Sequence, residues 1–189
     1  MNSNVMIRMV QALVGAVVLT LLMQVFAMTG FGQYIWMLFL PLLLFFALGA
    51  DFKKVPSMII CYICGVVWAF ISGMLQGVFS QFAPQVVVDI VPTIIVIFIV
   101  LTVHENLLAK TVLGNIPALF LGMCTTFFVF MMGLDLTPLH LVGFYLYGLL
   151  LAIVLVMSGM GVCSLLFGKE RAFAAIVGEA KGKDKEPQE

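Results

Sequence analysis

The sequence predicts an all-α membrane protein, a polytopic bundle of about six transmembrane helices with both termini in the cytoplasm. Three observations carry this prediction. Of 189 residues, 63% are hydrophobic and only 10% are charged, whereas a soluble domain has about 25% charged residues. The apolar residues fall into long runs separated by turn residues, and the basic residues all lie between or beside runs in a one-sided pattern. Together these features indicate that lipid is the solvent of most of the chain.

Each apolar run has roughly the length that a helix needs to cross a bilayer, about 20 residues. The first run lacks a small-x-small cleavage site, so we interpret it as a span and not as a signal peptide. We expect a transmembrane domain over residues 1–168 and a charged, partly disordered cytoplasmic tail over 169–189, with a short surface helix at 172–176. The predicted spans are residues 7–29, 34–50, 56–79, 86–103, 112–132 and 139–167.

The orientation follows from the basic residues, because cytoplasmic loops of membrane proteins collect Lys and Arg. With the N-terminus inside, Arg8, Lys53, Lys54 and Lys110 are all cytoplasmic, and so are the five basic residues after the last span. Five or seven spans would place some of them outside. The sequence therefore predicts a bacterial inner-membrane protein with both termini inside.

Two of the predicted spans, 56–79 and 112–132, each carry one face of small and polar side chains. Such faces allow close helix packing in membranes, where lipid tails are as apolar as Leu. They could equally line a narrow polar pathway, and the pattern leaves both interpretations open. The candidate packing residues are Gly65, Ala69, Gly73, Gly114, Ala118 and Gly122, and the candidate pathway residues are Trp68, Ser72, Gln76, Asn115, Thr125 and Thr126.

Ionisable groups are rare in the predicted membrane zone, and one inside a span is a functional hypothesis by default. Asp89 lies near the outer end of span 86–103, where it could form the mouth of a pathway or simply reach water. His104 and Glu105 mark the inner end of the same span. They could relay protons, or serve only as the polar residues that a cytoplasmic loop needs.

The sequence argues against an enzyme and against a bound cofactor. It contains no phosphate-binding loop, no dinucleotide glycine pattern and no H-E-x-x-H zinc motif. Cys61 and Cys64 form a C-x-x-C, but no His lies beside them and both sit in an apolar run, so we interpret them as small buried side chains and predict no metal. A net charge of zero gives no indication of nucleic-acid binding.

Two stretches resemble the YcdZ-like proteins, small bacterial inner-membrane proteins of unknown function. The stretches are Gly65-Val-Val-Trp-Ala69 and Ile116-Pro-Ala-Leu-Phe-Leu-Gly-Met-Cys-Thr-Thr-Phe127. The order of spans around them also fits, and the resemblance covers roughly residues 10–170. It implies a polytopic bacterial membrane protein without enzyme activity, and it supplies no established substrate. This chain departs from the family in its large aromatics, including those of 127–130.

Three functions remain open at the level of sequence. The leading hypothesis is a passive channel or facilitator for a small, neutral or weakly charged polar solute, acting as a homo-oligomer with its pathway between spans 56–79 and 112–132. The second is a proton-coupled secondary transporter that uses Asp89, His104 or Glu105. The third is a structural or accessory membrane subunit that moves no solute. The identity of the solute and the oligomer number do not follow from the residues.

Overall fold

The computed structural model describes residues 3–172, which consist of helices and turns without a β-strand in that range. Most of the predicted tail, including residues 173–176 of the expected surface helix, lies outside the described residues. The chain divides into two compact units, Met1–Ala50 with Tyr147–Glu189 and Asp51–Leu146. Helix α6 (Pro138–Phe167) contributes to both units, and each unit is described by itself.

The first unit begins with helix α1 (Ser3–Phe26), followed by the short η1 (Ala27–Phe31) and η2 (Gly32–Tyr34) and then by α2 (Trp36–Ala47). The chain turns at Gly30, whose φ of 88° is a left-handed conformation that glycine adopts without steric cost. Two consecutive left-handed residues, Gly49 and Ala50, follow the end of α2. Gly49 thus terminates α2, which has 12 residues.

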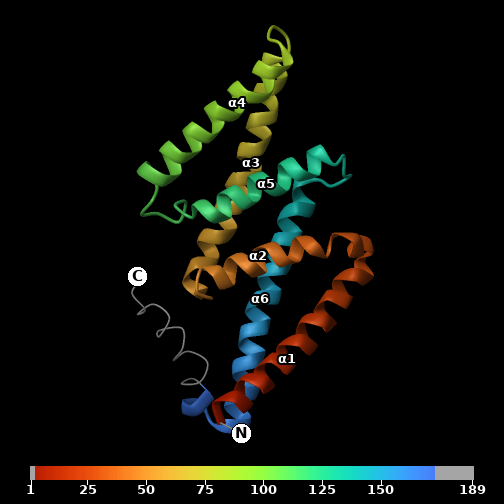
Figure 1. Ribbon diagram of the computed structural model, residues 1–189, viewed down its shortest axis with the longest axis vertical. Helices are drawn as coiled ribbons and strands as arrows, with labels where there is room; N and C mark the ends of the chain where they lie inside the picture. Colours follow the sequence, from red (N-terminus) through yellow and green to blue (C-terminus); the bar gives the residue numbers. More distant parts are fainter. Residues whose placement is uncertain (1–2, 173–189) are drawn as a thin grey trace. The chain divides into compact units, whose positions relative to one another are not determined.

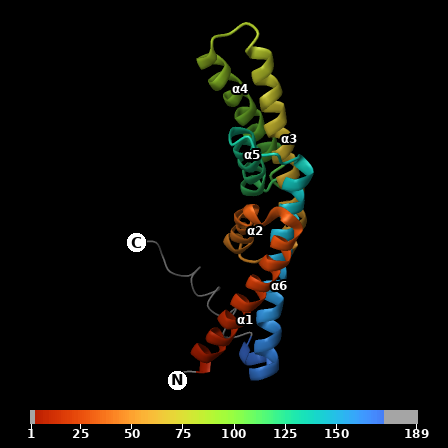
Figure 2. The same cartoon turned by 90° about the vertical axis from the view of Figure 1, so that its right-hand side faces the viewer.

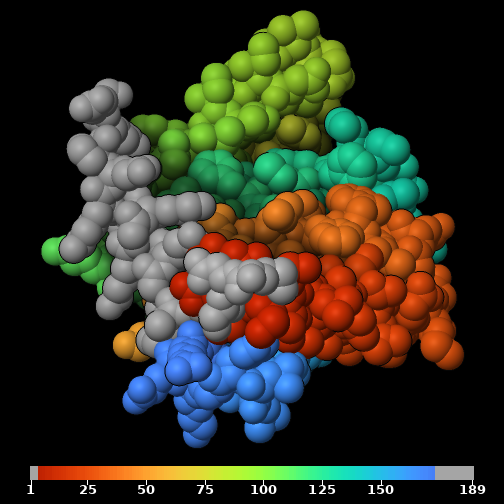
Figure 3. Space-filling model, turned by 60° about the horizontal axis from the view of Figure 1, so that its bottom comes forward, coloured from red at the N-terminus to blue at the C-terminus, as the bar shows by residue number. Residues whose placement is uncertain are grey.

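Helices α1 and α6 run antiparallel in this unit. The Cys163 thiol donates to the carbonyl of Ile7 (3.5 Å), and the Tyr147 hydroxyl donates to the carbonyl of Leu22 (2.7 Å). The start of α1 therefore pairs with the end of α6, and the end of α1 with an earlier part of α6. In Figure 3, α1 (red) borders both the orange residues around α2 and the blue end of α6.

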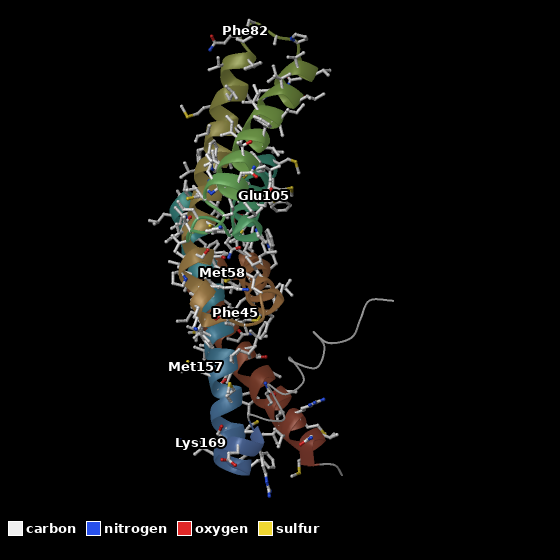
Figure 4. All side chains as sticks on the ribbon, turned by 90° about the vertical axis from the view of Figure 1, so that its left-hand side faces the viewer. Phe45, Met58, Phe82, Glu105, Met157 and Lys169 are labelled. Atoms are coloured by element: carbon white, nitrogen blue, oxygen red, sulfur yellow. The ribbon has the colours of Figure 1, made fainter. Side chains whose placement is uncertain are left out.

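The second unit consists of η3 (Phe52–Lys54), α3 (Val55–Phe79), α4 (Gln85–Val100), the π-helical η4 (Leu101–Leu107) and α5 (Ile116–Met131), together with the start of α6. Helices α3 and α4 form an antiparallel hairpin, and Phe82 lies in the turn that joins them (Figures 1 and 4). Helix α5 crosses this hairpin on the α3 side (Figures 1 and 2).

The crossing of α3 and α5 is a backbone-to-backbone contact. A Cβ added at Gly65 would overlap the carbonyl of Leu119, and one added at Gly122 would overlap the carbonyl of Tyr62. The two glycines therefore let the helices approach until main-chain atoms touch, as small residues do in membrane bundles. Ala69 and Ala118 extend the contact, and both side chains are fully buried.

Four helical segments are long and apolar enough to cross a membrane: Asn4–Tyr34, Phe52–Phe79, Gln85–Leu107 and Pro138–Phe167. The all-helical, membrane-like architecture predicted from the sequence is thus confirmed. Two predicted spans, 34–50 and 112–132, correspond to the shorter helices α2 and α5, of 12 and 16 residues. At 1.5 Å per residue these helices measure ~18 and ~24 Å, below the ~30 Å of the hydrocarbon core.

Candidate functional site

Two groups of polar side chains, all buried except the half-buried Trp68, flank the α3–α5 crossing. We call the first the Trp68 cluster, which consists of Trp68, Ser72, His104 and the carbonyl of Leu113. The second is the Tyr62 cluster, which consists of Tyr62, Thr125, Tyr145 and the carbonyl of Leu141. Buried polar groups are costly in an apolar environment unless they are hydrogen-bonded, so each cluster needs an explanation.

In the Trp68 cluster, the indole N–H of Trp68 donates to Nε2 of His104 at 3.1 Å. The other ring nitrogen, Nδ1, lies 2.9 Å from the carbonyl oxygen of Leu113. The imidazole is only 4% exposed, and its plane is nearly perpendicular to the indole, at 81°. His104 thus connects α3, η4 and the loop that leads into α5.

The partners of His104 assign its tautomer. An indole N–H can only donate and a carbonyl oxygen can only accept. Nε2 must therefore carry the lone pair and Nδ1 the proton, which makes the ring neutral with both nitrogens engaged. His104 lies within the π-helical η4, a type of helix found frequently at functional sites.

The loop before α5 is held to α3 by side chains that donate to its carbonyls. The Ser57 hydroxyl and the Cys61 thiol both donate to the carbonyl of Val112, at 2.7 and 3.3 Å. With the bond from His104 to Leu113, two consecutive carbonyls of this loop are bound by three side chains. Asn115 then begins α5 as its N-cap, accepting from the backbone N–H of Ala118.

Ser72 lies one helical turn beyond Trp68 on α3. Its side chain is 1% exposed, and its hydroxyl has no hydrogen-bond partner within residues 3–172. On the neighbouring helix α4, the buried residues are Val88, Pro92, Val96 and Val100, at four-residue spacing. A buried hydroxyl that stays unpaired costs roughly 1–3 kcal/mol.

In the Tyr62 cluster, the rings of Tyr62 and Tyr145 stack with centroids 3.8 Å apart and an angle of 12° between their planes. The Tyr62 hydroxyl lies 2.9 Å from Oγ1 of Thr125 and 3.4 Å from the carbonyl of Leu141. Because the Thr125 hydroxyl donates its proton to the carbonyl of Leu121 on its own helix, the Tyr62 hydroxyl donates to Thr125 Oγ1. The buried Tyr145 hydroxyl has no partner among the described residues.

The remaining predicted pathway residues are placed differently. Thr126 is fully buried and donates to the carbonyl of Gly122 within α5. Gln76 is half-buried on α3, two turns beyond Trp68. Of the small residues, Gly73 is exposed and a Cβ there would meet nothing within 4 Å, while Gly114 precedes α5 and packs on the backbone of Ala109.

The structure separates the predicted ionisable residues from one another. Asp89 is exposed on α4 and accepts from the side-chain amide of Gln85 at 2.7 Å. Glu105 is exposed on η4 (labelled in Figure 4), next in sequence to the buried His104. Only His104 lies in a polar cluster. Within residues 3–172, no three His, Cys, Asp or Glu side chains converge to hold a metal ion.

The Tyr62 cluster is the part of this site that sequence reasoning missed. Tyr62 and Tyr145 are 83 positions apart, and an aromatic in an apolar run is usually a packing residue. One signal was available: Tyr62 lies next to Cys61, one turn before Gly65, at the edge of the small-residue face. A tyrosine at that edge places its hydroxyl toward whatever packs on the glycines.

Comparison with known proteins identifies a family but no activity. Residues 11–169 match the model of a family described as "Protein of unknown function (DUF1097)". No curated protein and no solved structure is significantly similar to the chain. The match covers most of the chain, including both polar clusters and all of α2 to α6, and the chain therefore belongs to the DUF1097 family of proteins of unknown function.

Proposed function

We propose that this chain is a bacterial inner-membrane facilitator for a small, neutral or weakly charged polar solute. The observation that carries the proposal is the Ser72 hydroxyl, which is buried without a partner among the described residues, one turn from the Trp68–His104 hydrogen bond. Hydroxyl, amide and ring N–H groups exchange hydrogen bonds with a passing solute without trapping it as a full charge would.

The proposed route follows α3 on the side that faces α4. Because main-chain atoms touch where α3 crosses α5 at Gly65 and Gly122, the route would pass beside this crossing and not through it. Trp68, Ser72 and Gln76 rise along α3 over ~12 Å, from the buried His104 toward the end of α4 that carries Asp89. The opposing wall of valines is apolar, so the route would have one polar and one apolar side. Thr125, whose Oγ1 bonds the Tyr62 hydroxyl, would hold α5 to α3, whereas Thr126 bonds a carbonyl within α5.

The proposed topology has six spans with both termini in the cytoplasm. If the short α2 and α5 entered and left on one side, four spans would remain, and Lys53, Lys54 and Lys110 would lie outside. That arrangement opposes the preference of basic residues for the cytoplasm. Helices of ~18 and ~24 Å can cross where the bilayer thins locally. We also propose a homo-oligomer and a place among the YcdZ-like members of the family.

Solute flux into proteoliposomes tests the facilitator. Stopped-flow light scattering with glycerol and urea as probes should show faster re-swelling than in protein-free liposomes. Ser72→Ala should change the rate severalfold, because it removes the enclosed hydroxyl. Ser80→Ala is the matched control, since the exposed Ser80 hydroxyl only caps α3 through the carbonyl of Gly77. Absence of flux for every probe would favour the accessory-subunit alternative.

One observation favours a proton-coupled alternative, namely that a titratable side chain, His104, is buried in the Trp68 cluster. A coupled carrier would accumulate solute when an inward proton gradient is imposed. His104→Gln should abolish that accumulation while leaving downhill flux intact. With a passive facilitator, the proton gradient would cause no solute accumulation in either the parent protein or His104→Gln.

A further inference from the structure

The first unit contains a pocket of about 390 Å³ beside the contact between α1 and α6. This volume lies in the range of small-molecule sites, about 300–1,000 Å³. One side is formed by α1, and the other by Phe46 of α2 and by Leu155 and Val156 of α6. All of these residues belong to the same compact unit. The residues that α1 contributes are Arg8, Gln11, Ala12, Gly15, Ala16 and Leu19.

The pocket exists because the residues on this side of α1 are small. A Cβ built at Gly15 would lie 3.3 Å from Leu155 Cδ1, a tight contact, and Gln11 packs across Gly159. These contacts bring α1 and α6 together. Ala12 and Ala16, each next in sequence to one of these contact residues, leave a groove that larger side chains would fill.

The groove has a polar end and an apolar remainder. Arg8 and Gln11 lie near the start of α1, and from Ala12 to Leu19 every lining residue is apolar. The distance along the helix from Arg8 to Leu19 is ~16 Å at 1.5 Å per residue. One leaflet of the hydrocarbon core measures about half of 30 Å. The groove thus has the length of one leaflet, with a guanidinium at the level of the headgroups.

We infer that this groove binds a phospholipid with an anionic headgroup. The headgroup phosphate would bind the Arg8 guanidinium, which matches phosphate oxygens in a bidentate geometry, with the Gln11 amide as a second donor. An acyl chain would lie along Ala12 and Ala16 against Phe46. Basic pockets between transmembrane helices on the cytoplasmic side bind such headgroups. The site is independent of the proposed solute route, which lies in the other unit.

Native mass spectrometry of the full-length protein in maltoside tests this site. Palmitoyl-oleoyl phosphatidylglycerol should bind in preference to the zwitterionic phosphatidylcholine. Arg8→Gln should weaken phosphatidylglycerol binding about fivefold, the equivalent of the ~1 kcal/mol expected for one basic residue near anionic lipid. Lys53→Gln, at an exposed basic residue outside the pocket, should not change it.

A second pair of variants tests the acyl groove. Ala16→Phe fills the groove from an exposed position and should reduce binding of both lipids, whereas Val17→Phe, one residue away and outside the pocket, should leave both unchanged. Equal effects of Arg8→Gln and Lys53→Gln would overturn the headgroup site. If Ala16→Phe instead dissociates an oligomer without changing lipid retention, a second copy of the chain occupies the groove and the inference is wrong.

Discussion

Trp68 on α3 donates its indole N–H to Nε2 of His104 on η4 at 3.1 Å, and this bond links two helical segments that are 36 positions apart in the sequence. Each partner satisfies a group that would be costly to bury alone. The bond also fixes which nitrogen of His104 is protonated, and thereby directs the Nδ1 proton to the loop before α5.

A double-mutant cycle should reveal this bond. Trp68→Phe and His104→Phe each remove one partner. The destabilisation of the double mutant should be smaller than the sum of the two single-mutant values by about 0.6–1 kcal/mol, the usual contribution of a hydrogen bond within a membrane protein or a protein core. Reversible unfolding in mixed micelles measures the cycle. Trp36→Phe, at the other tryptophan of the chain and an exposed position, is the control. Strict additivity would contradict the bond.

Substitution of Gly65 by Ala should lower the free energy of unfolding by roughly 1–3 kcal/mol, because the new methyl group overlaps the Leu119 carbonyl. Gly73→Ala, two turns along the same helix, is the matched control: nothing described lies within 4 Å of its Cβ. That variant should be neutral or more stable by up to about 1 kcal/mol. Similar losses at the two positions would argue against the crossing described above.

The two stacked tyrosines should respond oppositely to removal of their hydroxyls. Tyr62→Phe takes the partner from Thr125 and should cost about 1 kcal/mol. Tyr145→Phe removes a hydroxyl without a described partner and should be neutral or stabilising. Thermal unfolding of both variants in one detergent makes the comparison. A loss of stability in Tyr145→Phe equal to that in Tyr62→Phe would show that the Tyr145 hydroxyl has found a partner.

Cysteine labelling with a membrane-impermeant maleimide should separate six spans from four. Six spans place Gln81 outside and Lys110 inside, whereas four spans reverse both positions. We expect Gln81→Cys to react in intact cells and Lys110→Cys to react only after lysis. The parent protein, whose four native thiols lie in apolar segments, measures the background. Labelling of Lys110→Cys in intact cells would contradict the six-span topology.

Much of the helical pattern could be predicted, since hydrophobic length and turn residues are local properties of the chain. Gly65 and Gly122 stood out for the same reason, because small residues at four-residue spacing define a helix face. The shortness of α2 and α5 was not predicted. Apolar residues continue through Val112–Leu113, where hydrogen bonds to the loop carbonyls, rather than polarity, precede the start of α5. The left-handed Gly49 follows the end of α2.

By itself the sequence determined that the chain is helical and apolar, because these properties depend on composition and on order along the chain. Only the tertiary structure decided which polar groups meet. Trp68 and His104 are 36 positions apart and Tyr62 and Tyr145 are 83 apart, so no periodicity within one helix connects them. Their contacts depend on how α3 packs against η4 and α6, which brings the distant side chains within hydrogen-bonding or stacking distance.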